Sequence, residues 1–206
     1  MAFSDYRNVA QVQKRFAITY REENYIMAQD IELPLPFVEE FLFNRDNIDV
    51  YTSEASRCEA IIFPILREVY KDYCQQCALW IQKPLSYDED LSGTPDYMIA
   101  TKSILGKTVL GEPLLIIVEA KKNDFEQGWG QCLAELVAAQ KINGDASLFV
   151  HGIVTDGKLW EFGKLTEDIF VKNIAGYTVD DLPNLFGALH FILQSSSTAI
   201  ASTPNA

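Results

Sequence analysis

The feature that most constrains this chain is a run of apolar residues that leads directly into charged ones, in the segment PLLIIVEAKK (residues 113–122). A strand that is apolar on both faces belongs inside a sheet with helices on either side, because both faces must be covered. Glu119 and Lys121 end this strand, and a spacing of two residues places their side chains on one face. Buried charge needs a partner, so the segment predicts either a structural ion pair or a functional site.

Hydrophobic periodicity and end signals predict the other elements. Asp156-Gly157 favours a tight turn and predicts a hairpin between two strands. A helix over 53–75 is expected to be perturbed near Pro64. The remaining expected elements are helices near 6–14, 36–44, 124–142 and 179–194, and strands over 77–85, 95–103, 114–122, 147–155, 158–165 and 168–176. This order predicts an α/β fold with a central mixed sheet flanked by helices.

The length and composition indicate one domain with short additions. The chain has 206 residues, of which 48% are apolar, enough for a full core. We expect residues 1–50 to be an N-terminal extension that packs on the core, 51–194 to form the core domain, and 195–206 to be a disordered tail. No apolar run approaches the ~18 residues of a membrane span, and the N-terminus lacks a secretory signal pattern. The expected location is cytoplasmic, with no membrane partner.

Charge, cysteines and histidines exclude several function classes. The net charge of −12 repels nucleic acid at long range and counts against a general nucleic-acid coat protein. Residues 101–122 have a local net charge of +2, which leaves room for a local basic groove. Cys74 and Cys77 form a CxxC at an expected helix end with no second ligand pair, so we expect plain thiols rather than a redox or zinc site. His151 and His190 are isolated and are expected to be structural.

A second carboxylate is expected beside the charged end of the apolar strand. Pro95-Asp96, in GTPDYMIA, opens the preceding strand, so that Asp96 can lie across from Glu119. Two carboxylates and a backbone carbonyl form a hard oxygen site of the kind that suits Mg²⁺. A lysine beside that metal can hold or deprotonate an attacking water, or stabilise the developing charge. The set therefore predicts hydrolysis of a phosphodiester.

Pro95-Asp96 followed by Glu119-Ala120-Lys121 resembles the PD-(D/E)xK nuclease superfamily, which has the fold of many restriction endonucleases. The resemblance spans residues 53–165 and is nearest to the nuclease domain at the start of type I restriction motor subunits and its stand-alone bacterial relatives. It implies a three-layer restriction-endonuclease-like fold and a nuclease that acts on DNA with Mg²⁺ or Mn²⁺. The resemblance also implies that Asp96, Glu119 and the Ala120 carbonyl bind the metal and that Lys121 positions or activates water.

The superfamily often carries a glutamate on the helix before the first core strand, and Glu59 matches that position. Helical spacing places Glu59 on the same face as three apolar residues, Ile62, Leu66 and Val69. An inward carboxylate calls for a partner, so the resemblance implies a metal-binding or supporting role for Glu59. The alternative is a capping or surface glutamate near the helix start.

Members of this branch also carry a glutamine near the active site, on the helix that follows the lysine. Gln131 is the best match, although Glu135 stands where the family often has an aromatic residue. The alternative for Gln131 is a solvated polar stripe. Gly128 and Gly130 lie in the same helix, where they either allow a close backbone approach or fray its first turn.

Three functional interpretations remain. The first is the Mg²⁺-dependent nuclease, for which a double-strand cut would favour a homodimer. The second is a catalytically silent nuclease-fold module that binds a partner, which the net acidity favours. The third is a structural ion pair in an unrelated α/β domain. The adjacent Lys122 points to the opposite face of the strand and is expected to be a solvated end or a phosphate contact.

Overall fold

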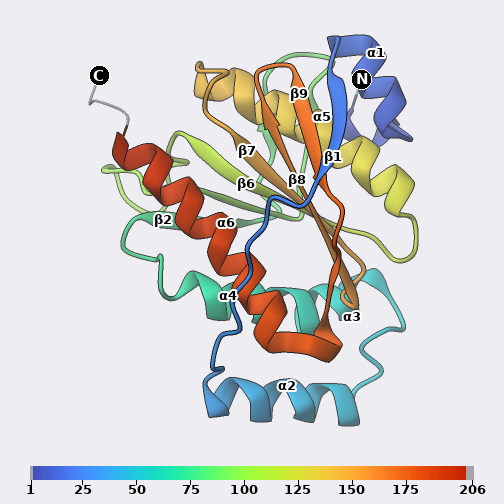
Figure 1. Cartoon of the computed structure of the whole chain (residues 1–206), viewed down its shortest axis with the longest axis vertical. Helices are drawn as coiled ribbons and strands as arrows, with labels where there is room; N and C mark the ends of the chain where they lie inside the picture. Colours follow the sequence, from blue (N-terminus) through green and yellow to red (C-terminus); the bar gives the residue numbers. More distant parts are fainter. Residues whose placement is uncertain (1, 203–206) are drawn as a thin grey trace.

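The computed structural model describes residues 2–202 and places a central sheet between helices on both faces (Figure 1). Helices α1 and α5 lie on one face, and α4 and α6 lie on the other. The elements in chain order are η1 (Phe3–Asp5), α1 (Val9–Phe16), β1 (Thr19–Glu23), α2 (Leu35–Asn47), α3 (Glu54–Arg57), η2 (Cys58–Ile62), α4 (Phe63–Tyr70), β2 (Cys77–Ile81), β3 (Leu85–Ser86), β4 (Ser92–Gly93), β5 (Tyr97–Thr101), β6 (Leu114–Ala120), α5 (Phe125–Asn143), β7 (Val150–Thr155), β8 (Leu159–Thr166), β9 (Ile169–Asn173), β10 (Tyr177–Thr178), η3 (Val179–Asp181) and α6 (Leu182–Ser202).

The main sheet is mixed and is centred on the apolar strand. Within residues 2–202 its order is β1-β9-β8-β7-β6-β5-β2, with β10 paired to β8. The pairs β6–β7 and β1–β9 are parallel, and the other pairs are antiparallel. All seven residues of β6 are buried, because helices cover both faces. The expected α/β class, with a mixed central sheet flanked by helices, is confirmed, as is the hairpin of β7 and β8 at Asp156-Gly157.

The long helix expected over 53–75 is interrupted before its proline. The turn η2 is π-helical, and the Phe63 N–H bonds to the carbonyl of Cys58, five residues back. Pro64 has no N–H, so the carbonyl of Ala60 loses its ordinary helical donor. The side-chain amide of Asn44 donates to that carbonyl instead, at 3.5 Å. The wider turn shifts the helical phase and changes which residues face the core.

Two stretches differ from the sequence-based expectation. For β1 the sequence predicts only an extended piece after the helix near 6–14, and the structure leaves all five residues of this strand exposed. It joins the sheet as an edge strand through parallel pairing with β9, so part of the segment 1–50 belongs to the sheet itself. Residues 195–202, expected to be disordered, continue α6 to Ser202. The rest of the expected tail, 203–206, lies outside the described residues.

His151, on β7, is a buried structural residue. It is 2% exposed, and its Nε2 lies 3.3 Å from the Ser195 Oγ of α6. Its ring stacks on Tyr25, with the ring centroids 6.1 Å apart. Burial first, and then the charge of Lys164, lowers the pKa of His151 to about 3. The folded protein therefore keeps this imidazole neutral where the unfolded chain protonates it.

This difference predicts a pH-dependent loss of stability. The contribution of His151 to the free energy of unfolding is complete above the ordinary histidine pKa of about 6.5. It is lost as the pH falls toward the pKa of His151 in the folded protein. Between pH 7 and pH 5, His151 alone should lower the free energy of unfolding by about 2 kcal/mol. Urea unfolding at both pH values measures this effect. The decrease in the free energy of unfolding from pH 7 to pH 5 should be about 2 kcal/mol larger in wild type than in His151→Gln. Equal losses in the two proteins would contradict the assignment.

Candidate active site

The candidate site forms where β5 begins and β6 ends. Tyr97 pairs with Val118, so the next residues outward, Asp96 and Glu119, are cross-strand neighbours on one face. The Ala120 N–H donates to Asp96 Oδ2 at 2.8 Å. An extended residue directs its N–H and C=O to the same side, so the Ala120 carbonyl also faces the Asp96 side of β6. The structure thus places Asp96, Glu119 and Ala120 together.

Glu119 and Lys121 form a buried ion pair at the end of β6. The Lys121 Nζ lies 2.6 Å from Glu119 Oε1, and the two side chains are 18% and 2% exposed, respectively. Burial first, and then the charge of Asp96, raises the pKa of Glu119. Burial lowers the pKa of Lys121, but the surrounding carboxylates outweigh it and the net shift is upward. Lys121 therefore remains a cation at neutral pH.

The second carboxylate oxygen of Glu119 has no hydrogen-bond partner among the described residues. Oε2 is buried, although a buried acceptor ordinarily finds a donor. Leaving such a group unsatisfied costs about 1–3 kcal/mol, and more when it is charged. A cation or a bound donor beside Oε2 would remove that penalty.

Glu135, on α5, is a buried carboxyl that was not assigned to the site from the sequence. It is fully buried, and its Oε1 accepts a bond of 3.2 Å from Gln131 Nε2. Burial first, and then the charge of Glu119, raises its pKa well above the ordinary value. Gln131 is 8% exposed, so the alternative of a solvated stripe is wrong. The four-residue spacing from Gln131 to Glu135, the two polar residues of the otherwise apolar stretch 128–139, was the available signal.

Glu59 does not occupy the inward position expected for it. It is exposed, because the π-helical turn alters the helical phase between Glu59 and Leu66. It lines a cleft of about 230 Å³ whose wall also includes Asp96 and Glu54. The charge of Glu54 contributes to the pKa shifts of Asp96, Glu119 and Lys121, and that of Glu59 contributes to the raised pKa of Tyr97, next to Asp96. Glu54, in the first turn of α3, is thus a further helical carboxylate beside the site that the sequence did not single out.

The donor chemistry of these residues fits a hard divalent cation. Asp96 and Glu119 are neighbouring carboxylates, the Ala120 carbonyl faces the same side, and Glu119 Oε2 lacks a partner. Within the described part of the chain, no three His, Cys, Asp or Glu side chains already form a cluster that could hold a metal. A metal here would therefore use two carboxylates, a backbone carbonyl and water, as Mg²⁺ commonly does.

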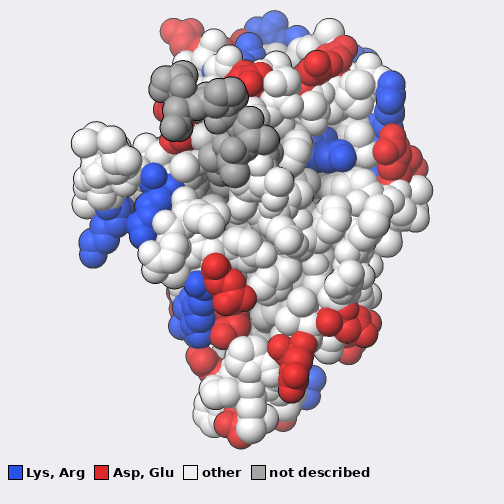
Figure 2. Space-filling model, turned by 60° about the vertical axis from the view of Figure 1, so that its left-hand side comes forward, with Lys and Arg blue, Asp and Glu red and all other residues white. Residues whose placement is uncertain are grey.

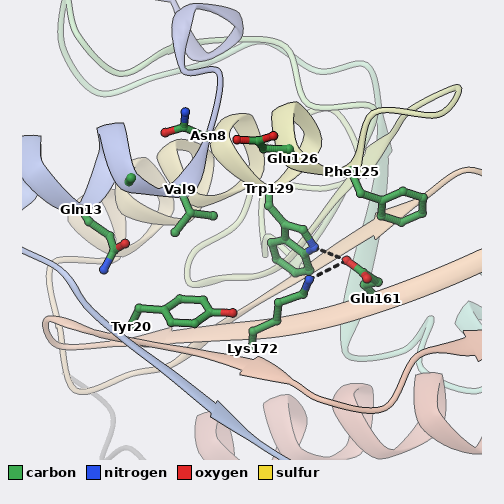
Figure 3. A pocket seen from close by; sticks show the side chains of 10 residues that line it. Asn8, Val9, Gln13, Tyr20, Phe125, Glu126, Trp129, Glu161 and Lys172 are labelled. Atoms are coloured by element: carbon green, nitrogen blue, oxygen red, sulfur yellow. Dashed lines mark hydrogen bonds and ion pairs between the residues drawn. The ribbon is translucent and has the colours of Figure 1, made fainter.

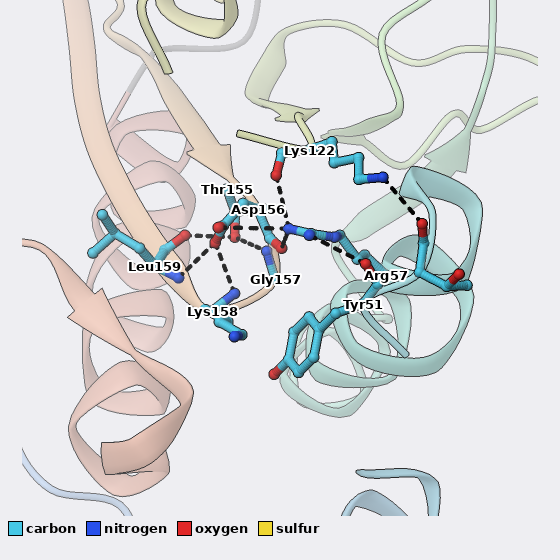
Figure 4. A network of polar contacts seen from close by, with 9 residues as sticks. Tyr51, Arg57, Lys122, Thr155, Asp156, Gly157, Lys158 and Leu159 are labelled. Carbon is cyan, nitrogen blue, oxygen red and sulfur yellow. Dashed lines mark hydrogen bonds and ion pairs between the residues drawn. The ribbon is translucent and has the colours of Figure 1, made fainter. Parts of the chain in front are cut away.

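Arg57, at the end of α3, connects the loops around the site (Figure 4). Its side chain is 7% exposed and donates to the carbonyls of Lys122 at 2.9 Å, Asp156 at 2.8 Å and Tyr51 at 3.3 Å. It also lies 3.5 Å from Asp156 Oδ2. One guanidinium therefore holds together the segment after β6, the β7–β8 turn and the loop that leads into α3. Lys122 turns away from Lys121, and its Nζ donates to the Thr52 carbonyl at 3.1 Å.

Removing the Arg57 guanidinium should loosen all three segments. Arg57→Met leaves buried carbonyls without donors and should lower the free energy of unfolding by about 3 kcal/mol. Lys158→Met is the matched control, because Lys158 is exposed and its ammonium also lies over the Tyr51 ring. Denaturant unfolding should show a change under about 0.5 kcal/mol for that control. A small effect of Arg57→Met would show that water replaces the guanidinium.

Gly128 brings α5 into direct contact with Lys121. A Cβ at this position would lie 2.7 Å from Val154 Cγ1 and 3.0 Å from Lys121 Cγ. Gly130 allows a second close approach, since its Cβ would lie 2.5 Å from the Asn8 backbone nitrogen. The structure therefore favours close packing over a frayed first turn for both glycines.

Gly128→Ala should destabilise the protein although alanine is the better helix former. Overpacking against Val154 should lower the free energy of unfolding by about 1–3 kcal/mol, which exceeds the gain of about 1 kcal/mol in helix propensity. Val154→Ala removes the closest contact of the added methyl group. Gly128→Ala should therefore lower the free energy of unfolding less in the Val154→Ala background than in wild type. A double-mutant cycle by urea unfolding measures this coupling, and additive losses would contradict the steric explanation.

No family model matches this chain, and no curated protein shows significant similarity to it. Within residues 2–202, no helix has both the length and the apolar character needed to cross a lipid bilayer. The function is therefore inferred from the geometry of the site.

Proposed function

We propose that this protein is a metal-dependent nuclease of restriction-endonuclease-like fold that hydrolyses phosphodiester bonds in DNA. One observation carries the proposal: a buried Glu119–Lys121 pair, with one unpartnered carboxylate oxygen, ends the central strand beside Asp96. A structural ion pair alone would leave this oxygen unexplained and would not need a second carboxylate next to it.

Asp96, Glu119 and the carbonyl of Ala120 would hold Mg²⁺ or Mn²⁺. Such a metal supplies charge neutralisation at the phosphate and lowers the pKa of a bound water. Lys121 keeps its proton at neutral pH because its pKa is raised. Its role is therefore to donate hydrogen bonds that orient water and stabilise negative charge on the phosphate, rather than to remove a proton.

Gln131 and Glu135 would support the site from α5. Burial first, and then the charge of Glu119, raises the pKa of Glu135, so this carboxyl responds to the charge at the site. Gln131 holds that carboxyl through its side-chain amide. The two residues would thus position Glu119 without contacting the substrate.

A second candidate is a catalytically silent module with the same fold that binds a protein partner. The low exposure of Glu119 and Lys121 favours it, because the pair already satisfies much of its own charge. The net charge of −12 also disfavours long-range attraction of nucleic acid. Figure 2 shows, however, that acidic and basic side chains are scattered around a broad uncharged area on the face in view, so the acidity does not form one continuous field there.

Cleavage assays on matched lysine variants test the proposal. Plasmid DNA, single-stranded DNA and RNA are incubated with Mg²⁺ or Mn²⁺ and, in parallel, with EDTA. Wild type should cut only with metal, and Lys121→Ala should reduce the rate by about a hundredfold or more, because it removes the cation at the site. Lys122→Ala should cut at nearly the wild-type rate, since its ammonium is directed to Thr52.

The pattern of outcomes separates the two candidates. Metal-dependent cutting that survives in Lys121→Ala would indicate a contaminant or a different site. No cutting by folded wild type on any substrate, together with no Mn²⁺ binding by calorimetry, would support the silent module. Direct conversion of plasmid to the linear form, rather than nicking first, would indicate that two copies act together.

A further inference from the structure

A second cavity, of about 540 Å³, lies away from the acidic pair (Figure 3). It is bounded by α1, β1, β8, β9 and the first turns of α5. Tyr20, Phe125 and Trp129 supply aromatic surface, and Gln13 and Glu161 supply polar groups. A cavity of this size with aromatic walls and a few polar groups is typical of sites for small planar ligands.

One carboxylate fixes the polar side of this cavity. Glu161 Oε2 accepts from Trp129 Nε1 at 2.6 Å and lies 2.9 Å from Lys172 Nζ. Figure 3 shows the indole and the ammonium converging on Glu161 from α5 and β9. The Lys172 ammonium also lies 5.5 Å from the centroid of the Trp129 ring. These contacts give the cavity a preorganised wall rather than a flexible one.

The cavity and the candidate active site share one face of the sheet. Glu119 pairs with Val154, and Val154 pairs with Glu161, so the three side chains form one cross-strand row. Two strand spacings separate Glu119 from Glu161, which corresponds to roughly 10 Å. Helix α5 reaches both places, with Gly128 against Lys121 and Trp129 in the cavity wall. Val154, between them, is buried beneath Gly128 of α5, so a nucleic-acid strand that engages both places would pass over the first turn of α5, where Phe125 and Glu126 line the cavity.

We propose that this cavity binds one unpaired nucleobase of the nucleic-acid substrate, close to the phosphate that is cut. This inference rests on the proposed nuclease function. Tyr20 is 37% exposed and offers a ring on which a base can stack. Glu126, Glu161 and Lys172 line the cavity, and because Lys172 is paired with Glu161, the lining keeps a net negative charge that favours a neutral base over a phosphate.

The same carboxylates determine which bases are preferred. Glu126 and Glu161 are hydrogen-bond acceptors, and adenine, cytosine and guanine carry exocyclic amino groups that can donate to them. Thymine and uracil have no amino group. Their single ring N–H is a poorer match for two carboxylates, so the cavity should select bases with an amino group, adenine among them, over thymine or uracil, with stacking adding affinity for any base.

Binding is measured without metal, so that cleavage does not enter the result. Fluorescence anisotropy in EDTA compares labelled hexamers of deoxyadenosine and of thymidine. Wild type should bind the adenine oligomer several-fold more tightly, and Tyr20→Ala should weaken that binding by about tenfold through lost stacking. Tyr87→Ala is the matched control, because Tyr87 is 48% exposed and lies outside the cavity. It should change neither affinity.

A second variant fills the cavity from an exposed helix position. Ala10, on α1, is exposed and lines the cavity, so Ala10→Trp should block it without a cost in the core. It should weaken binding of the adenine oligomer as Tyr20→Ala does. Unchanged affinity in both folded variants, equal affinity for the two oligomers in wild type, or binding of free adenosine without binding of either oligomer would overturn the proposal.

Parallel cleavage assays with Mn²⁺ keep the two proposals apart. Adenine-selective binding that is lost in Tyr20→Ala, without cutting by wild type, would reject the nuclease and retain the base site. Metal-dependent cutting by wild type, with no effect of Tyr20→Ala or Ala10→Trp on binding, would retain the nuclease and reject the base site.

Discussion

The rest of the structure depends on the complete burial of β6. A strand covered on both faces cannot turn to water where its apolar run ends, so each polar group there needs a partner within the protein. The Ala120 N–H bonds to Asp96, the Lys121 N–H bonds to the Thr155 carbonyl, and the Lys122 carbonyl accepts from Arg57. These three bonds connect β6 to the start of β5, the end of β7 and the end of α3. The position of the site follows from them.

Because β6 is buried, the charges at its end cost free energy of folding, and stability by itself gives no reason for them to be there. Asp96, Glu119 and Glu135 interact with one another, and Lys121 is paired with Glu119. Apolar residues of similar volume are often at least as stabilising as a buried ion pair. An accumulation of carboxyl groups with perturbed pKa values in one place is typical of functional sites. It is the physical reason to treat this end of β6 as a site rather than as a packing feature.

Sequence reasoning worked where a pattern is local. The apolar run of β6, the turn at Asp156-Gly157 and the end of α5 at Gly144 each depend on residues close together in the chain. It failed where a distant contact overrides the pattern. Exposed β1 is a strand only because β9 is available to pair with it. Glu59 is exposed in the wall of a cleft rather than buried in the core, because one π-helical turn breaks the regular spacing on which its expected position depended.

The sequence by itself determined that a buried strand ends in a carboxylate and an ammonium two residues apart, and that another carboxylate opens an earlier strand. Strand alternation and hydrophobicity are properties of short segments, so these features needed no knowledge of distant contacts. Only the tertiary structure decided that Glu135 approaches Glu119, that Glu54 lines the same cleft as Asp96 and Glu59, and that Tyr20 and Trp129 bound a cavity on the same face. These depend on strand register, on helical phase and on how closely α5 approaches the sheet, all of which are set by packing between segments far apart in the chain.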